Sequence, residues 1–61
     1  MTWSEHKVKL HMQAVGHRVK RVWEEPDGWV RFWSTNSWGT HLEGLAHPAG
    51  LIGKYKVVKA W

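Results

Sequence analysis

The 61-residue sequence contains no cysteine, so neither a disulfide bond nor thiolate chemistry is available to it. It also shows no signal-peptide pattern and no apolar run long enough to cross a bilayer. The absence of cysteine is typical of proteins from reducing compartments. We therefore expect a cytoplasmic protein that does not interact with membranes.

Motifs for catalysis and cofactor binding are missing as well. No Ser/His/Asp ordering and no phosphate-cradling glycine loop is present. The five histidines form neither an i, i+4 helical pair nor a close pair on one strand face, so a metal site is not expected. We predict a protein that is not an enzyme and that carries no cofactor or metal.

The length predicts a single domain spanning residues 1–61, and a marginally stable one, because small domains bury little of their surface. Dense packing of the six tryptophans, self-association into a homo-oligomer, or a bound partner could each supply the missing stability. Nine Lys and Arg residues against five Asp and Glu give a net charge of +4. A basic balance of this kind favours anionic partners such as nucleic acid.

The clearest structural signal runs from Val19 to Trp33, where two runs of β-branched and aromatic residues flank Pro26-Asp27-Gly28. Proline presets the backbone of the first turn position, and glycine adopts the left-handed conformation at little cost. A three-residue loop of this kind pairs Glu25 with Trp29 through a type I turn and a bulge. Counting outward, the predicted cross-strand pairs are Trp23 with Arg31, Val22 with Phe32, and Arg21 with Trp33.

Strand alternation gives this hairpin two different faces. One face carries Val22, Val30 and Phe32 and is predicted to be core. The other sets indoles against guanidinium groups, and each such contact contributes roughly 0.5–1 kcal/mol at an exposed site. This second face is either a packing surface covered by a terminus or another subunit, or a recognition surface. Its members are Arg21, Trp23, Trp29, Arg31 and Trp33, with Val19 at the far end.

The flanking segments also predict strands. Residues 7–14 alternate apolar and polar side chains, which favours a half-buried strand with Lys7 and Lys9 on its wet face. A helix is the alternative, because Thr2-Trp3-Ser4-Glu5 could form a capping box. Residues 40–45 and 54–61 predict two further strands, with a bulge or weak point at Gly44. Residues 47–50 predict a tight turn between them, in the form of one turn of 3₁₀ helix.

Five short strands separated by turn signals predict an all-β fold. The chain is too short for a sandwich, whereas a closed barrel would leave no exposed strand edges. The predicted architecture is therefore a small five-stranded SH3-like barrel.

Scattered short matches over most of the chain resemble landmarks of the plasmid-borne type II dihydrofolate reductases. These matches are Gly16-His17-Arg18-Val19-Lys20-Arg21, Trp33-Ser34-Thr35-Asn36, Ala46-His47-Pro48 and Tyr55. The family's members are small SH3-like barrels that assemble into tetramers, so the resemblance implies a barrel. The family's Val-Gln-Ile-Tyr segment corresponds here to residues 51–55, where only Tyr55 matches, and no catalytic role is carried over.

The interleaving of basic and aromatic residues predicts the function. We expect a non-enzymatic binding module whose Trp/Arg sheet face contacts nucleic acid, either single-stranded or non-specifically, because bases stack on indoles and phosphates pair with cations. The alternative is a protein–protein module, an assembly component or a small inhibitor of a larger enzyme, that uses the same tryptophans as anchors. The predicted binding residues are Arg21, Trp23, Trp29, Arg31, Trp33, Trp38, Lys7, Lys9 and Lys20.

Overall fold

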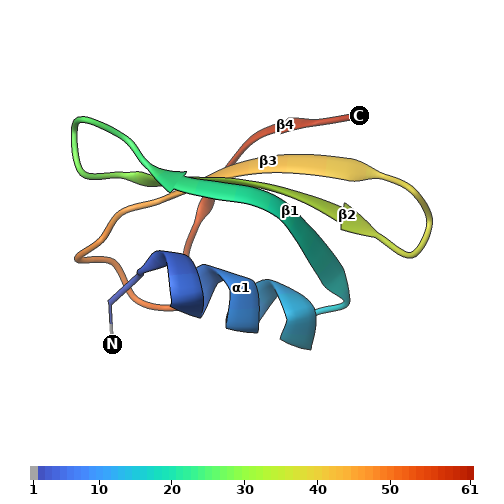
Figure 1. The fold of residues 1–61 in the computed structure, drawn as a ribbon, viewed down its shortest axis with the longest axis horizontal. Coiled ribbons are helices and arrows are strands. Elements are labelled where there is room, and N and C mark those ends of the chain that lie inside the picture. The colour runs from blue at the N-terminus through green and yellow to red at the C-terminus, as the bar shows by residue number, and fades with distance from the viewer. Residues whose placement is uncertain (1) are drawn as a thin grey trace.

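The computed structural model describes residues 2–61 and contains one helix followed by four strands (Figure 1). The elements are α1 (Glu5–Ala14), β1 (His17–Glu24), β2 (Val30–Asn36), β3 (His41–Ala46) and β4 (Lys56–Ala60). The strands form one antiparallel sheet in the order β1-β2-β3-β4. The fold is therefore mostly β, as expected, but the closed five-stranded barrel is wrong: the sheet is open, and β1 and β4 are its edges.

The segment predicted as a first strand is the helix α1. Ser4 caps it with an extended backbone and a side-chain oxygen that accepts a hydrogen bond from the Lys7 amide at 3.3 Å. Val8 and Met12 are completely buried, as expected for residues four apart on one helical face. Leu10, which a strand would have buried beside them, is 53% exposed. The strand prediction was wrong because this segment buries its side chains with a helical spacing.

The central hairpin has the predicted register. The three predicted cross-strand pairs are all present, the Glu25 amide donates to the Trp29 carbonyl at 2.7 Å, and Gly28 has a φ of +92°. The register shifts once, between Val19 and Arg21, which identifies Lys20 as the extra residue of a β-bulge. Val19 consequently lies opposite Ser34 on the core side, so its predicted place on the Trp/Arg face was wrong.

The core lies between α1 and one face of the sheet. Val8 and Met12 meet Val30, Phe32 and Ala46 there, together with Trp3. The segment that joins β3 to β4 lies on the same side of the sheet as α1 (Figure 1) and brings the Tyr55 ring to 5.4 Å from Phe32. Residues 47–50 form the predicted tight turn there, closed by a hydrogen bond from the Gly50 amide to the His47 carbonyl at 2.8 Å, although they are not a 3₁₀ helix.

Gly44 is required by a close approach of the Phe32 ring. The two residues are direct partners across β2 and β3, and a Cβ at Gly44 would lie only 2.4 Å from the ring. The register between β3 and β4 shifts between Glu43 and Gly44, but the extra residue is Val58 of β4, so the bulge lies in the strand opposite Gly44 and not at Gly44 itself. None of the helices among residues 2–61 has the length and apolar character needed to span a membrane.

Candidate binding surface on the outer sheet face

The sheet face opposite α1 is not covered by any element of residues 2–61 (Figure 1). We call it the outer sheet face. Cross-strand partners share a face, so the register assigns its members. They are Arg18, Arg21 and Trp23 of β1; Arg31, Trp33 and Thr35 of β2; His41, Glu43 and Leu45 of β3; and Lys56 and Lys59 of β4. Trp61 follows β4 and pairs with the His41 backbone.

Arg21, Trp23 and Trp33 form the first aromatic cluster of this face. The two indoles meet edge to face, with ring centroids 5.6 Å apart and an interplanar angle of 85°. The guanidinium carbon of Arg21 lies 4.7 Å from the centroid of Trp23 and 5.9 Å from that of Trp33. Trp33 remains 36% exposed. The predicted combination of indoles and a guanidinium group is therefore present at the sheet surface.

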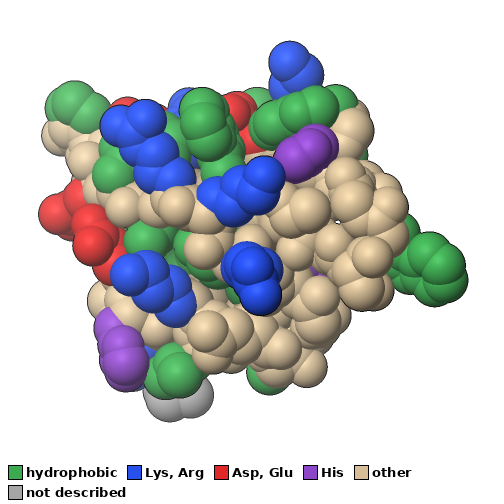
Figure 2. Space-filling view, turned by 45° about the vertical axis from the view of Figure 1, so that its right-hand side comes forward, with side chains coloured by type: hydrophobic (Ala, Val, Ile, Leu, Met, Phe, Trp, Pro, Cys, Tyr) green, Lys and Arg blue, Asp and Glu red, His purple; other side chains and the backbone are tan. Residues whose placement is uncertain are grey.

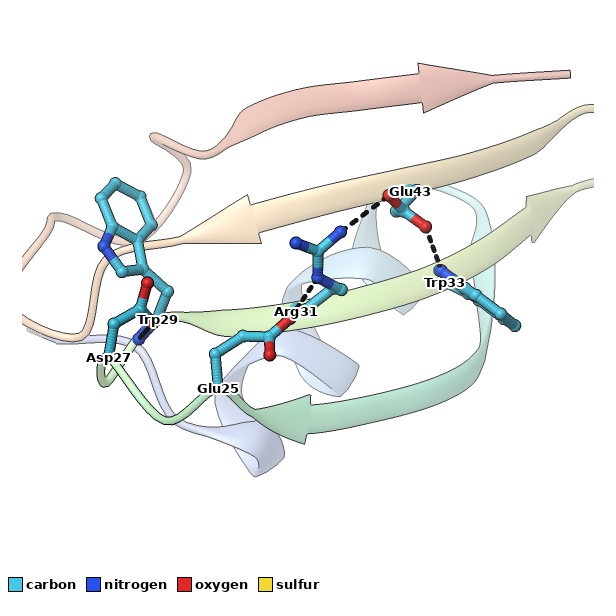
Figure 3. A network of polar contacts seen from close by, with 6 residues as sticks. All are labelled: Glu25, Asp27, Trp29, Arg31, Trp33 and Glu43. Atoms are coloured by element: carbon cyan, nitrogen blue, oxygen red, sulfur yellow. Dashed lines mark hydrogen bonds and ion pairs between the residues drawn. The ribbon is translucent and has the colours of Figure 1, made fainter.

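Arg31 has a different role from the one its register position suggested. Although it lies opposite Trp23, its guanidinium group binds two carboxylates, with Nε donating to Glu25 and Nη1 donating to Glu43 at 2.8 Å (Figure 3). The hydrogen bond to Glu25 raises the pKa of Arg31 above its already high usual value. Arg31 is thus a permanently charged, neutralised crosslink between strands.

Glu43 connects Arg31 to the first aromatic cluster. One carboxylate oxygen accepts from Arg31, and the other accepts from the Trp33 indole Nε1 at 2.6 Å (Figure 3). The Trp33 side chain is therefore held at both ends, by the ring of Trp23 and by this carboxylate. Such preorganisation lowers the entropic cost of binding a ligand at the indole.

A second aromatic cluster, which the sequence reasoning missed, lies at the other side of the face. The rings of His41 and Trp61 stack with centroids 5.3 Å apart and an interplanar angle of 20°. Lys59 places its ammonium group 5.3 Å from the Trp61 ring. Val58 is the extra residue of the β4 bulge, and the bulge turns Lys59 toward the same face as Lys56. The sequence signal that could have indicated this cluster is the pair Lys59 and Trp61, which lie two residues apart near the end of the chain.

The other predicted binding residues lie apart from these clusters. Trp29 packs edge to face against His47, with centroids 4.9 Å apart, at the end of β2 remote from Trp33 (Figure 3). Trp38 is 90% exposed in the turn between β2 and β3. Lys20 occupies the β1 bulge. Lys7 and Lys9 belong to α1, the layer on the opposite side of the sheet.

Positive charge on the outer sheet face is largely uncompensated. Both side-chain ion pairs found among residues 2–61 involve Arg31. Arg18, Arg21, Lys56 and Lys59 therefore have no carboxylate within 4.0 Å in this part of the chain. Figure 2 shows Lys and Arg side chains beside exposed hydrophobic side chains over the upper, sheet-bearing part of the molecule.

Within the described residues 2–61, no three His, Asp or Glu side chains are grouped closely enough to hold a metal ion. No protein-family model, curated protein or solved structure matches the chain significantly. The similarity to the type II reductases therefore remains one of short motifs, and the barrel that it implied is not the fold.

Proposed function

We propose that this protein is a non-enzymatic module that binds single-stranded nucleic acid on its outer sheet face. The observation that carries the proposal is the first aromatic cluster, in which Arg21 lies over two indoles on an uncovered sheet. Exposed aromatic rings stack with unpaired bases of any sequence, and a nearby cation neutralises the phosphates. The net charge of +4 supports the same partner through counterion release.

The arrangement favours single strands over duplexes. Stacking requires bases whose faces are accessible, and these are unavailable inside a duplex. Sequence reading in the major groove uses a protruding helix or β-ribbon. Here α1 packs beneath the sheet and the indoles are part of the sheet surface, so a stacked single strand fits the outer sheet face better.

Quenching of intrinsic tryptophan fluorescence by a single-stranded oligonucleotide of about ten nucleotides tests this proposal. We expect binding at about 50 mM salt that weakens steeply toward 200 mM. Trp33→Leu should weaken binding by about 1–3 kcal/mol, the contribution of one stacked base. Trp38→Leu is the matched control, since that indole is exposed but lies outside both clusters. Absence of binding at low salt would refute the proposal.

A protein-binding role is the second candidate, and β4 favours it. All five residues of this edge strand are exposed, including Val57 at 52% and Val58 at 44%. An exposed edge can accept a further strand from a partner or from a second copy of the chain. Lys56 and Lys59 oppose such pairing between copies. Association that is insensitive to salt and is abolished by Val58→Lys would identify this role.

A further inference from the structure

We propose that a concavity at one end of the outer sheet face binds a phosphate group of the nucleic acid, next to the base that stacks on Trp33. This inference rests on the proposed function and assigns a specific site to the backbone of the ligand. The concavity has a volume of about 380 Å³. Its lining residues are Gly16, Arg18, Lys20, Thr35, Asn36 and Ser37.

The lining includes several groups that can bind a phosphate. It contains two cations and two hydroxyl groups but no carboxylate. Arg18 and Lys20 are exposed, and neither has a carboxylate within 4.0 Å among residues 2–61. Arginine can bind two phosphate oxygens at once, while lysine acts as a mobile point charge.

Asn36 adds a donor to this lining because its own acceptor is already used. Its Oδ1 accepts hydrogen bonds from the Trp38 amide at 3.0 Å and from the Thr40 amide at 2.9 Å. The Nδ2 group, with two N–H donors, is then the end of the side chain left for a ligand. A lining of donors without carboxylates selects an anion over a cation.

The β1 bulge explains how the concavity and the first aromatic cluster coexist on one strand. Regular alternation would place Lys20 and Arg21 on opposite faces. With Lys20 as the extra residue, Lys20 lines the concavity while Arg21 covers the indoles of the same face. The bulge therefore adds one cation to the outer sheet face.

The concavity and the indole are also spaced as neighbouring parts of one strand of nucleic acid. Arg18 pairs with Thr35, and the next outer-face pair is Arg21 with Trp33. Trp33 and Thr35 are two residues apart, or about 6.6 Å along β2. A base on the first aromatic cluster thus has a phosphate site directly beside it.

The test compares two double variants that remove the same charge from different layers. Arg18→Gln combined with Lys20→Gln empties the concavity of cations, whereas Lys7→Gln combined with Lys9→Gln changes α1. Oligonucleotide affinity is measured over a salt series, after circular dichroism has shown that both variants fold. We expect the concavity variant to bind roughly tenfold or more weakly at low salt, with a slope of log K against log salt shallower by about 1.4. The α1 variant should stay within about threefold of the parent, because its charges belong to the layer on the opposite side of the sheet and are screened over about 10 Å at 0.1 M salt.

The outcomes separate this inference from the proposed function. If the parent protein binds the oligonucleotide but the two double variants have equal affinities and slopes, the phosphate site is refuted while the proposed function stands. If the parent protein shows no binding, the proposed function itself fails. A nucleoside monophosphate should shift the amide resonances of residues 35–37 and the corresponding nucleoside should not. Equal shifts with both ligands would also refute the site.

Discussion

The Trp33 indole donates a hydrogen bond of 2.6 Å to Glu43, its direct partner on the neighbouring strand β3. The same carboxylate accepts a hydrogen bond from Arg31 at 2.8 Å. Glu43 therefore orients an indole that we assign to base stacking and also neutralises a guanidinium group. Orienting the indole favours the binding of a polyanion, whereas neutralising the guanidinium group opposes it. Substitution of Glu43 can separate the two effects.

Glu43→Gln should lower stability but raise affinity for single-stranded nucleic acid. Loss of the charged acceptor for the Trp33 indole costs about 1 kcal/mol, which lowers Tm by about 4–8 °C in a domain of this size. Without the Glu43 carboxylate, the Arg31 guanidinium group is less neutralised and can pair with a phosphate. The slope of log K against log salt should therefore become steeper by about 0.7. Glu24→Gln, which removes the same charge from an exposed position on β1, is the control. A Glu43→Gln variant that binds no more tightly than Glu24→Gln contradicts the assigned role.

Met12→Ala and Leu10→Ala should differ sharply in stability. Met12 is completely buried against the sheet, so its truncation costs about 2–5 kcal/mol. Leu10 is 53% exposed, and its truncation should change the free energy of unfolding by less than about 0.5 kcal/mol. Urea denaturation followed by circular dichroism measures both. Comparable losses at the two positions would mean that this segment is a strand.

Gly44→Ala should destabilise the fold by about 1–3 kcal/mol, because its Cβ would overlap the Phe32 ring. Phe32→Leu removes that ring and should also be destabilising, through the cavity it leaves. Combined, the two changes should cost less than the sum of the single costs, since each relieves the steric conflict of the other. A double-mutant cycle from thermal unfolding provides the measurement, and strict additivity would disprove the contact.

Ser4→Ala should cost about 1 kcal/mol, the usual contribution of a side-chain cap at a helix start. Thr2→Ala is the matched control, because Thr2 opens the capping-box pattern in the sequence while the structure places the cap at Ser4. The two variants are compared by their urea midpoints at constant m-value. A larger loss at Thr2 would move the start of α1 to that residue.

The hairpin of residues 19–33 was predictable because its turn chemistry is local. Pro26-Asp27-Gly28 determines the loop length, and loop length sets the register of the two strands. The register in turn brings Arg21 and Trp33 together, so the centre of the candidate site could be derived from the sequence.

Residues 5–14 were not predictable in the same way, because their side chains match strand and helix periods at once. The choice depends on the burial of Val8 and Met12 against a sheet that forms elsewhere in the chain. The wrong prediction of a closed barrel follows from assigning this segment to a strand. With residues 5–14 in a helix, residues 2–61 contain no fifth strand to close a barrel, and the helix covers only one side of the sheet.

The other features that the sequence did not predict depend on bulges and on strand pairing beyond the hairpin. Alternation alone cannot show that Val58 is an extra residue, and so it did not place Lys59 on the outer sheet face. The carboxylate of Glu43 reaches Arg31 and Trp33 only because β3 pairs with β2 in a particular register. That register depends on tertiary packing and is not encoded in a local turn signal.

The most direct test of nucleic-acid binding follows the six indole N–H resonances in a ¹H–¹⁵N correlation spectrum during titration with a single-stranded oligonucleotide. We predict shifts for Trp23, Trp33 and Trp61, which lie on the outer sheet face, and an unchanged resonance for Trp3, which is buried beneath the sheet. If Trp23 and Trp33 keep their positions at saturating oligonucleotide, the outer sheet face is not the binding surface.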